Sequence, residues 1–187
     1  RGRILLDDIR LEKRDTSHPQ PIWIDDFEGE DWQQNLAGGK SFEFVGGAAS
    51  IRCGLDSKRA MADRGQSLMI SYGGSIGLDL VKDGFSYCGW AAKIGGVDLS
   101  SHQALEMRVR GNQGGEKPNV YLTDGVIKRG LDIEKYGAVA TSWSVVQIPL
   151  KDFAGKGIDL THVDGVKFIF EWDAMSGTIW VDDIQIK

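Results

Sequence analysis

Residues 104–110 read Ala-Leu-Glu-Met-Arg-Val-Arg, so apolar and charged side chains alternate at every step after the first. Successive side chains of a β-strand point to opposite faces of a sheet, and this alternation is therefore typical of a strand with one buried and one solvated face. Such strands occur in antiparallel sheets, which pack one face on a core and leave the other in water. The stretch therefore indicates an all-β fold.

Segments of strand length occupy the chain on both sides of this stretch. We expect strands at residues 41–45, 49–54, 66–72, 85–94, 104–110, 118–124, 130–133, 143–149, 165–171 and 178–186. Pairs such as Gly46-Gly47, Gly73-Gly74 and Asp124-Gly125 separate them, and glycine adopts the backbone angles that tight turns need. Helix is expected only as single turns, at residues 33–36 or 56–62. This spacing of short strands predicts an all-β, two-sheet β-sandwich of the jelly-roll type.

Composition narrows the functional classes. With 187 residues, 41% hydrophobic and 26% charged, the chain has the length and balance of one globular domain. Its net charge of −5 and its scattered basic residues argue against nucleic acid as a partner, because affinity for phosphates needs clustered Lys and Arg. The most apolar stretches, such as residues 166–172, have only the length of a strand and are too short to span a membrane, so we expect no membrane partner either.

The two ends of the chain resemble each other. Residues 2–11 and 177–186 both read as a strand that carries an Asp-Asp pair, and residues 13–21 between the first copy and the main domain have linker composition. We expect residues 1–12 to be the closing strand of an upstream similar module, residues 13–21 a linker, and residues 22–187 the sandwich. The alternative is that residues 1–12 form an extra edge strand of the same sandwich. Neighbouring domains of a larger chain are the partners that the first interpretation implies.

Catalytic and redox motifs are weak. His18, His102 and His162 lie in loop-like contexts with no nucleophile motif near them. Neighbouring carboxylates on a strand point to opposite faces, so an acid–base pair would need carboxylates from different strands. We therefore expect no enzyme, with a hydrolase or lyase built on cross-strand carboxylates as the alternative. Cys53 and Cys88 allow one disulfide or two free thiols.

Acidic residues mark both ends of the main domain. Asp25, Asp26 and Glu28 open it, and Asp182 with Asp183 closes it. If the first and last strands are neighbours, these oxygens converge, and calcium takes six to eight oxygen ligands. A structural calcium site that joins the chain ends is therefore expected, against the alternative of two solvated acidic ends.

Aromatic and planar polar residues supply a second candidate site. In residues 84–90, Phe85 and Tyr87 alternate with Ser86 and Trp90, so one set faces outward. An exposed aromatic ring can stack on the apolar face of a sugar, while polar side chains bond its hydroxyls. A further set of sugar-contact candidates follows these principles: Tyr121, Asp124, Arg129 and Trp172. The alternative is that the aromatic rings belong to the core.

Five segments in order carry a resemblance to a known family: residues 24–29, 83–89, 143–153, 158–168 and 177–184. Together they resemble the family 11 carbohydrate-binding modules and related jelly-roll modules of glycoside hydrolases, over nearly all of residues 22–187. The resemblance implies a jelly roll, bound calcium, no catalysis and a concave groove that holds one β-glucan chain. It matches Tyr87 to a groove tyrosine and Asp164 to a groove acid, and it puts Phe170 where another groove tyrosine stands.

One departure from the family concerns residues 154–157, a short loop without the Arg, Asp and Tyr that the family carries there. Asp124, Arg129 or Trp172 would have to replace them. We therefore expect a secreted or cell-surface, non-catalytic module that binds a β-glucan-like polysaccharide in a groove and targets a larger extracellular protein to it. The alternative is a structural or protein-interaction sandwich of the same fold without sugar binding.

Overall fold

The computed structural model describes residues 19–60, 65–74, 77–79, 84–171 and 176–187. Residues 1–12, most of the expected linker at residues 13–21, and Trp172 lie outside these ranges. The division of the first 21 residues into a strand and a linker therefore stays a prediction.

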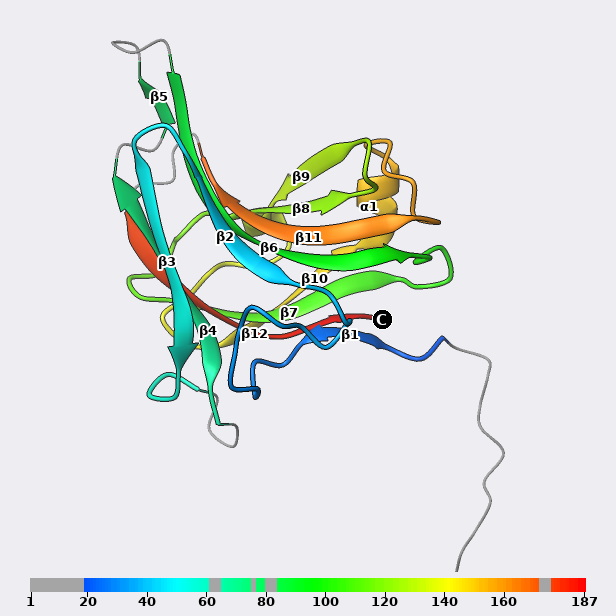
Figure 1. Ribbon diagram of the computed structural model, residues 1–187, viewed down its shortest axis with the longest axis horizontal. Helices are drawn as coiled ribbons and strands as arrows, with labels where there is room; N and C mark the ends of the chain where they lie inside the picture. The colour runs from blue at the N-terminus through cyan, green and yellow to red at the C-terminus, as the bar shows by residue number, and fades with distance from the viewer. Residues whose placement is uncertain (1–18, 61–64, 75–76, 80–83, 172–175) are drawn as a thin grey trace, which may run out of the picture.

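Two antiparallel sheets stack into a sandwich (Figure 1). The first sheet has the strand order β10 (Ser144–Pro149), β7 (Ala104–Gly111), β12 (Gly177–Ile186), β4 (Ser67–Gly74) and β3 (Ala49–Asp56), with β1 (Ile22–Asp25) also paired to β12. The second has the order β2 (Ser41–Gly46), β6 (Gly84–Val97), β11 (Val163–Phe170), β8 (Asn119–Thr123) and β9 (Lys128–Asp132), with β5 (Gly77–Asp79) also paired to β6. The predicted two-sheet β-sandwich is confirmed.

The ten expected strands are all present, with ends shifted by a few residues. Strands β1 and β5 were not predicted, because four and three residues are too few for an alternating pattern to emerge. The helical turns expected at residues 33–36 and 56–62 are wrong in their described parts, which form non-helical turns, bends, one isolated bridge at Gln34 and the end of β3. Helix occurs at α1 (Leu150–Ala154) and in the 3-10 turn η1 (Ile133–Lys135), where Pro149 and Asp132 end the preceding strands.

The core lies between the sheets and is built from the inward half of each alternating strand. Leu105, Met107 and Val109 of β7 are fully buried from one side, and Trp90 and Phe168 meet from the other with ring centroids 5.7 Å apart. Full burial of one large apolar side chain contributes ~1.5–3 kcal/mol. Because even-numbered residues of β6 face this core, its odd-numbered residues face away from the sandwich.

The two cysteines are free thiols. Cys88 is buried, and burial raises its pKa to about 11, so its sulfur stays protonated at neutral pH. Cys53 is half-buried, and burial followed by the nearby Glu43 carboxylate raises its pKa as well. Both behave as small core side chains.

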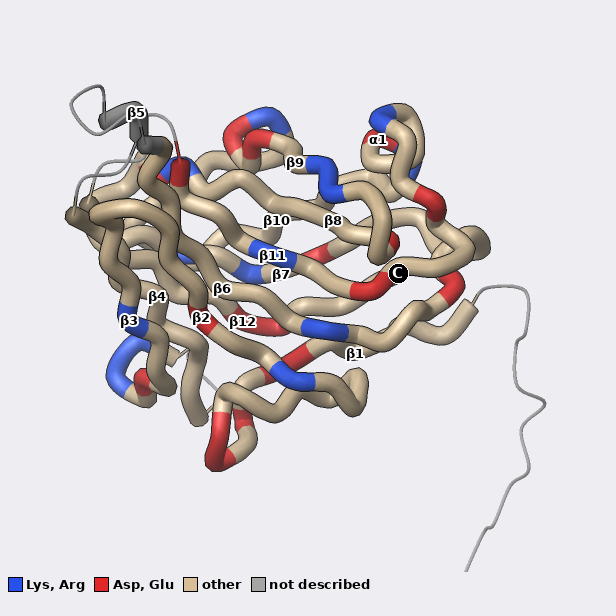
Figure 2. Tube along the Cα trace, turned by 45° about the horizontal axis from the view of Figure 1, so that its top comes forward, with Lys and Arg blue, Asp and Glu red and all other residues tan. Residues whose placement is uncertain are grey.

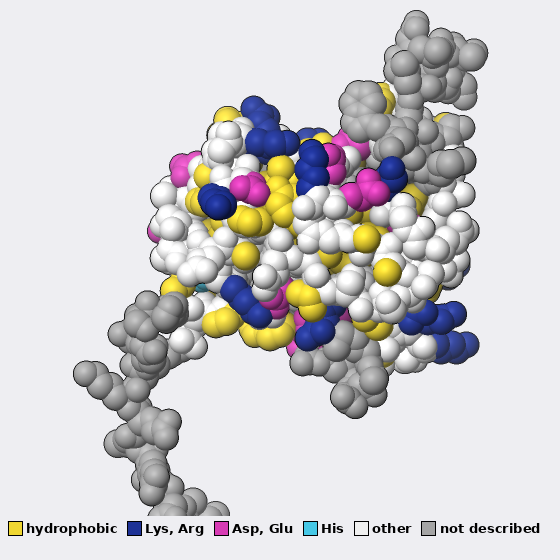
Figure 3. Space-filling view, turned by 180° about the vertical axis from the view of Figure 1, so that it is seen from behind, with side chains coloured by type: hydrophobic (Ala, Val, Ile, Leu, Met, Phe, Trp, Pro, Cys, Tyr) yellow, Lys and Arg dark blue, Asp and Glu magenta, His cyan; other side chains and the backbone are white. Residues whose placement is uncertain are grey.

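Charges are spread over the surface of the molecule. Figure 2 shows acidic and basic residues on strands of both sheets as well as on turns. Seen from behind, acidic, basic and hydrophobic side chains are interspersed (Figure 3). Within the described ranges, no helix has the length and apolar character needed to cross a membrane.

Candidate functional site

The outer face of the second sheet has small residues at its centre and large ones around them. Strand register defines three cross-strand rows on this face. They are Phe42, Ala91, Lys167, Tyr121 and Gly130; Phe44, Gly89, Ile169, Asn119 and Asp132; and Lys93, Gly165, Thr123 and Lys128. Because Ala91 and Gly165 carry little or no side chain, the sheet is low at these two positions, whereas the ring of Phe44 covers Gly89.

This low centre opens into a continuous hollow. A pocket of about 340 Å³ lies over Ala91 and Gly165, with Lys167 and Asp164 also on its walls. A second pocket of about 600 Å³ adjoins it toward residues 33–42 and shares Phe42 and Lys93 with it. We call the two together the trough. It has the open, shallow form that an elongated ligand can enter from the side.

An aromatic row begins at Phe42, which lines the trough, and continues away from it along β2 and β6 through Phe44, Tyr87 and Phe85. Successive ring centroids lie 6.4, 6.2 and 6.0 Å apart. Phe42 is 37% exposed and Tyr87 is half-buried. The Tyr87 ring lies over Gly46, where an added Cβ would come within 2.5 Å of it. The row therefore extends from the trough along the outer face of the second sheet, and Tyr87 belongs to it; its contact with a ligand stays a prediction.

Tyr121 lies on the same face on β8, half-buried. Its hydroxyl donates a hydrogen bond to Oε1 of Glu171 at 2.5 Å, and its ring covers Gly130, where a Cβ would be 2.4 Å from the ring. The Nζ of Lys128 lies 5.4 Å from the ring centroid. Burial and the hydrogen bond to Glu171 raise the pKa of Tyr121, so the phenol stays neutral and its ring is held in place.

Asp164 also lines the trough, as predicted. Its Oδ1 lies 3.5 Å from Nε2 of the exposed His162, and its side chain is 38% exposed. The second oxygen, Oδ2, points toward Gly125, where an added Cβ would lie 2.4 Å away. A partly exposed carboxylate at this position is suited to accept hydrogen bonds from ligand hydroxyls.

Three other predicted contact residues lie elsewhere. Phe170 is wrong as a groove residue: it stands opposite Cys88, faces the core and stacks on Tyr72 with centroids 3.7 Å apart. Asp124 uses both oxygens within the fold, accepting the backbone N–H of Val126 and Ile127 at Oδ1 and that of Asp159 at Oδ2.

Arg129 points away from the trough face, because it pairs opposite the inward Leu122 at the sheet edge. Its Nε donates to the carbonyl of Lys156 at 3.0 Å, which ties β9 to the loop after α1. Trp172 lies outside the described residues. Of the seven predicted contact residues, Tyr87, Tyr121 and Asp164 lie on the trough face.

Sequence reasoning missed Phe42, Phe44, Lys93 and Lys167. The alternation Ser-Phe-Glu-Phe in β2 favours inward Phe, but Ser41 is the buried member, where it accepts a hydrogen bond from Asn35. Glu43 accepts the backbone N–H of Cys53 at 2.8 Å. The available signal was the pair of small residues Gly89 and Ala91 at alternate positions of one strand, because a face with so little side chain needs large side chains on a neighbouring strand to cover it.

The acidic ends of the domain meet at the junction of β1 and β12, where Asp25 stands opposite Ile184 (Figure 1). Asp25 is 4% exposed, its Oδ1 accepts the N–H of Phe27 at 3.0 Å, and its Oδ2 is buried without a hydrogen bond. Burial raises the pKa of Asp25 to about 6. Phe27 and Asp183 both have positive φ, at 55° and 50°, so the backbone is constrained on both sides of this junction.

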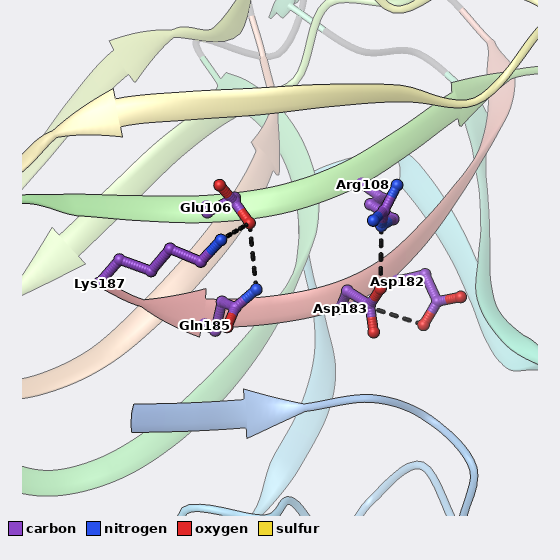
Figure 4. Close-up of polar contacts among 6 residues, drawn as sticks. All are labelled: Glu106, Arg108, Asp182, Asp183, Gln185 and Lys187. Atoms are coloured by element: carbon purple, nitrogen blue, oxygen red, sulfur yellow. Dashed lines mark hydrogen bonds and ion pairs between the residues drawn. The ribbon is translucent and has the colours of Figure 1, made fainter. Parts of the chain in front are cut away.

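The five predicted cation ligands do not all converge. Asp182 accepts the N–H of Asp183 at 2.8 Å, and Asp183 pairs with Nε of Arg108 at 2.9 Å (Figure 4). Asp26 accepts the N–H of Glu28, and Glu28 in turn accepts that of Gly65 at 3.0 Å.

In the described part of the chain, no three Asp, Glu, His or Cys side chains are grouped closely enough to hold an ion. An ion at the junction would therefore need backbone carbonyls beside Asp25, which calcium accepts as ligands. Asp25 fits such a role through its buried, unbonded oxygen, whereas Asp26 and Glu28 do not.

Comparison with known proteins finds one matching protein family and several solved structures of similar fold. A family model described as carbohydrate binding domain 30 matches residues 48–187. No curated protein sequence matches the chain. The resemblance to family 11 and related jelly-roll modules that the sequence motifs indicated is confirmed by this match and by the solved structures.

Three of those structures are carbohydrate-binding modules from Clostridium thermocellum. The family 30 module of the cellulosomal cellulase Cel9D-Cel44B has a TM-score of 0.67 and 20% identity, covering 90% of this chain and 98% of that one. The family 11 module of the cellulosomal cellulase Lic26A-Cel5E has a TM-score of 0.66 and 19% identity, with 91% and 95% covered. A family 11 module in complex with a β-1,3-1,4-mixed-linked tetrasaccharide has a TM-score of 0.66 and 18% identity, with 89% and 94% covered. At these identities the likeness shows a shared fold.

Proposed function

Because the chain belongs to the carbohydrate binding domain 30 family and is a carbohydrate-binding module, we propose that its trough holds one chain of a β-glucan-like polysaccharide. The observation that carries this proposal is the aromatic row that begins at Phe42, beside a floor of Ala91 and Gly165. Small floor residues let a ligand approach the backbone, while the rings offer apolar surface to sugar faces. Asp164 and Thr123 supply acceptors and a donor for hydroxyls on the same walls.

The role we propose is binding without catalysis. The acids on or beside the trough face have other partners, since Asp132 pairs with Lys135, Glu171 accepts from Tyr121 and Asp164 faces His162. The related family 11 and family 30 modules are described as parts of cellulosomal cellulases. By analogy, this module would hold a larger extracellular protein on its polysaccharide, where tethering raises the local concentration of the partner domain.

Calorimetry or affinity electrophoresis against soluble β-glucans, xylan and mannan tests the binding proposal. We expect at least one polymer to bind, and we expect Tyr87→Ala to weaken that binding about tenfold, or ~1.4 kcal/mol, because one stacking ring is lost. Trp23→Ala is the matched control, since Trp23 is 38% exposed on β1 in the opposite sheet. Binding of no polymer would favour a structural or protein-interaction role for the sandwich.

A structural calcium ion at the junction of β1 and β12 forms a second part of the proposal. The support for it is Asp25, whose Oδ2 is buried and unbonded beside the last strand. A cation there would compensate the cost of burying that oxygen. When bound, it would join the first and last strands of the domain by direct ligation.

A further inference from the structure

Three lysines lie on the trough face, and we call them the lysine trio: Lys93 and Lys167 line the 340 Å³ pocket, and Lys128 stands at the end of the cross-strand row that begins at Lys93. Lys93 and Lys128 stand at the two ends of one cross-strand row, with Gly165 and Thr123 between them. Lys167 lies in the next row, between Ala91 and Tyr121. Neighbouring strands are about 4.8 Å apart, so the flexible four-carbon stems allow all three ammonium groups to reach over the small floor.

The acids of this face have partners other than the trio. Asp132 pairs with Lys135 at 2.6 Å, Asp164 faces His162 at 3.5 Å, and Glu171 accepts from Tyr121 at 2.5 Å. Among the described residues, no ion pair includes a member of the trio. The pocket therefore carries an excess of positive charge in a chain whose net charge is −5.

The trio members also influence one another. Burial lowers the pKa of Lys167, and the ammonium groups of Lys128 and Lys93 lower it further. Like charges that repel across a half-buried pocket are stabilised when an anion enters between them. A neutral sugar hydroxyl supplies no such compensation.

We infer that this pocket receives an acidic substituent of the polysaccharide, a uronate carboxylate or a sulfate ester, while the aromatic row holds the sugar rings. The inference rests on the proposed function and adds a substrate class to it: glycans that carry negative charge. The negative net charge of the rest of the molecule repels polyanions in general. The preference for an acidic glycan would therefore require its charged group to reach the pocket while its sugar rings lie on the aromatic row.

Polymers that share a β-1,4-glucan backbone and differ in the charge of their substituents separate the effect of the charge from that of the sugar backbone. We expect carboxymethyl cellulose or cellulose sulfate to bind at least about tenfold more tightly than hydroxyethyl cellulose, and we expect the difference to shrink as NaCl rises from about 0.05 M to about 0.5 M. The two charged polymers distinguish a carboxylate from a sulfate preference.

Lys167→Gln should remove most of the preference for the charged polymer, measured as the ratio of its affinity to the affinity of the same variant for hydroxyethyl cellulose. Lys93→Gln combined with Lys128→Gln should act in the same direction, and both of these side chains are exposed, so folding is not at risk. Lys58→Gln, an exposed lysine on the turn after β3, is the control and should change neither affinity.

Equal, salt-independent binding of charged and neutral polymers would overturn the acidic-substituent inference and leave the proposed function intact. Binding of none of these polymers, and of none in the neutral panel, would overturn both.

Discussion

Glu106 joins β7 to β10 and β12 through one carboxylate, and Figure 4 shows its bonds to Gln185 and Lys187. It lies on the outer face of β7 but is only 9% exposed, because its neighbours cover it. It accepts hydrogen bonds from Gln147 on β10, from Gln185 on β12 at 3.0 Å and from Nζ of Lys187 at 2.5 Å. Burial works to raise the pKa of Glu106, but the hydrogen bonds from Lys187, Gln147 and Gln185 outweigh it and lower the pKa.

This depressed pKa predicts acid sensitivity. A group with a lowered folded-state pKa contributes stability above its unfolded pKa of about 4.3 and loses that stability as pH falls through the folded value. Glu106→Gln should therefore lower the free energy of unfolding by ~1–3 kcal/mol at pH 7 and by less at pH 3. Urea unfolding at several pH values measures this. Glu134 is a surface acid whose side chain is 50% exposed. Glu134→Gln should therefore change the free energy of unfolding by a similar small amount at pH 7 and at pH 3.

At the scale of the element, the pairing of β6 with β11 depends on glycine. A Cβ on Gly89 would lie 2.2 Å from the carbonyl oxygen of Phe168 and 2.6 Å from the ring of Phe44. The first of these is backbone in the neighbouring strand, so it can yield only if the strands separate. Gly89 thus allows the two strands to approach and leaves room for the ring of Phe44.

Gly89→Ala should therefore lower the free energy of unfolding by ~1–3 kcal/mol, the usual cost of overpacking. Gly54→Ala is the matched control, because Gly54 lies in strand β3 with no atom within 4 Å of an added Cβ. The control should change stability by no more than about 0.5 kcal/mol. Thermal and urea unfolding compare the two variants, and equal losses would show that the close approach at Gly89 is unimportant.

Strands proved easier to predict than the faces of strands. Residues 104–110 alternate charged and apolar side chains, so both the strand and its inward face follow from the sequence. In β11 the run Val-Lys-Phe-Ile-Phe has apolar residues on both faces, and only pairing with Cys88 places Phe170 inward. In β2 the alternation of residue types was misleading. Ser41 faces inward, where it accepts a hydrogen bond, and Phe42 therefore faces outward.

The site was predictable in part for the same reason. Tyr87 and Tyr121 were found because each alternates with residues that are clearly buried. Asp124 was assigned to the ligand because its sequence context does not reveal that two turns need its oxygens. Lys93 and Lys167 are 74 positions apart in the chain and come together only through the register of β6 with β11. A local sequence pattern does not reveal that register.

At the scale of the whole molecule, β1 and β12 bring the two ends of the domain together. Ile22 pairs with Ile186 and Asp25 with Ile184, so the first strand is held by the last. Chain ends that are held in this way cannot fray independently, and a ligand bound only by the folded state would strengthen the junction.

Removal of calcium with a chelator should lower the melting temperature by roughly 5–10 °C relative to protein with calcium at about 100 times its Kd. Calorimetry with calcium restored should reverse the change. Asp25→Asn should abolish the response, while Asp26→Asn should retain it, because the Asp26 carboxylate bonds the N–H of Glu28. If calcium does not change the melting temperature of the unaltered protein, the proposed calcium site is wrong.

The aromatic row described above extends over four rings with neighbouring centroids 6.0–6.4 Å apart. A monosaccharide covers about one such ring, so it would collect only a fraction of the available contact. Oligosaccharides should gain affinity with each added unit until the row is full and then reach a plateau. The degree of polymerisation at that plateau would report the length of the bound segment.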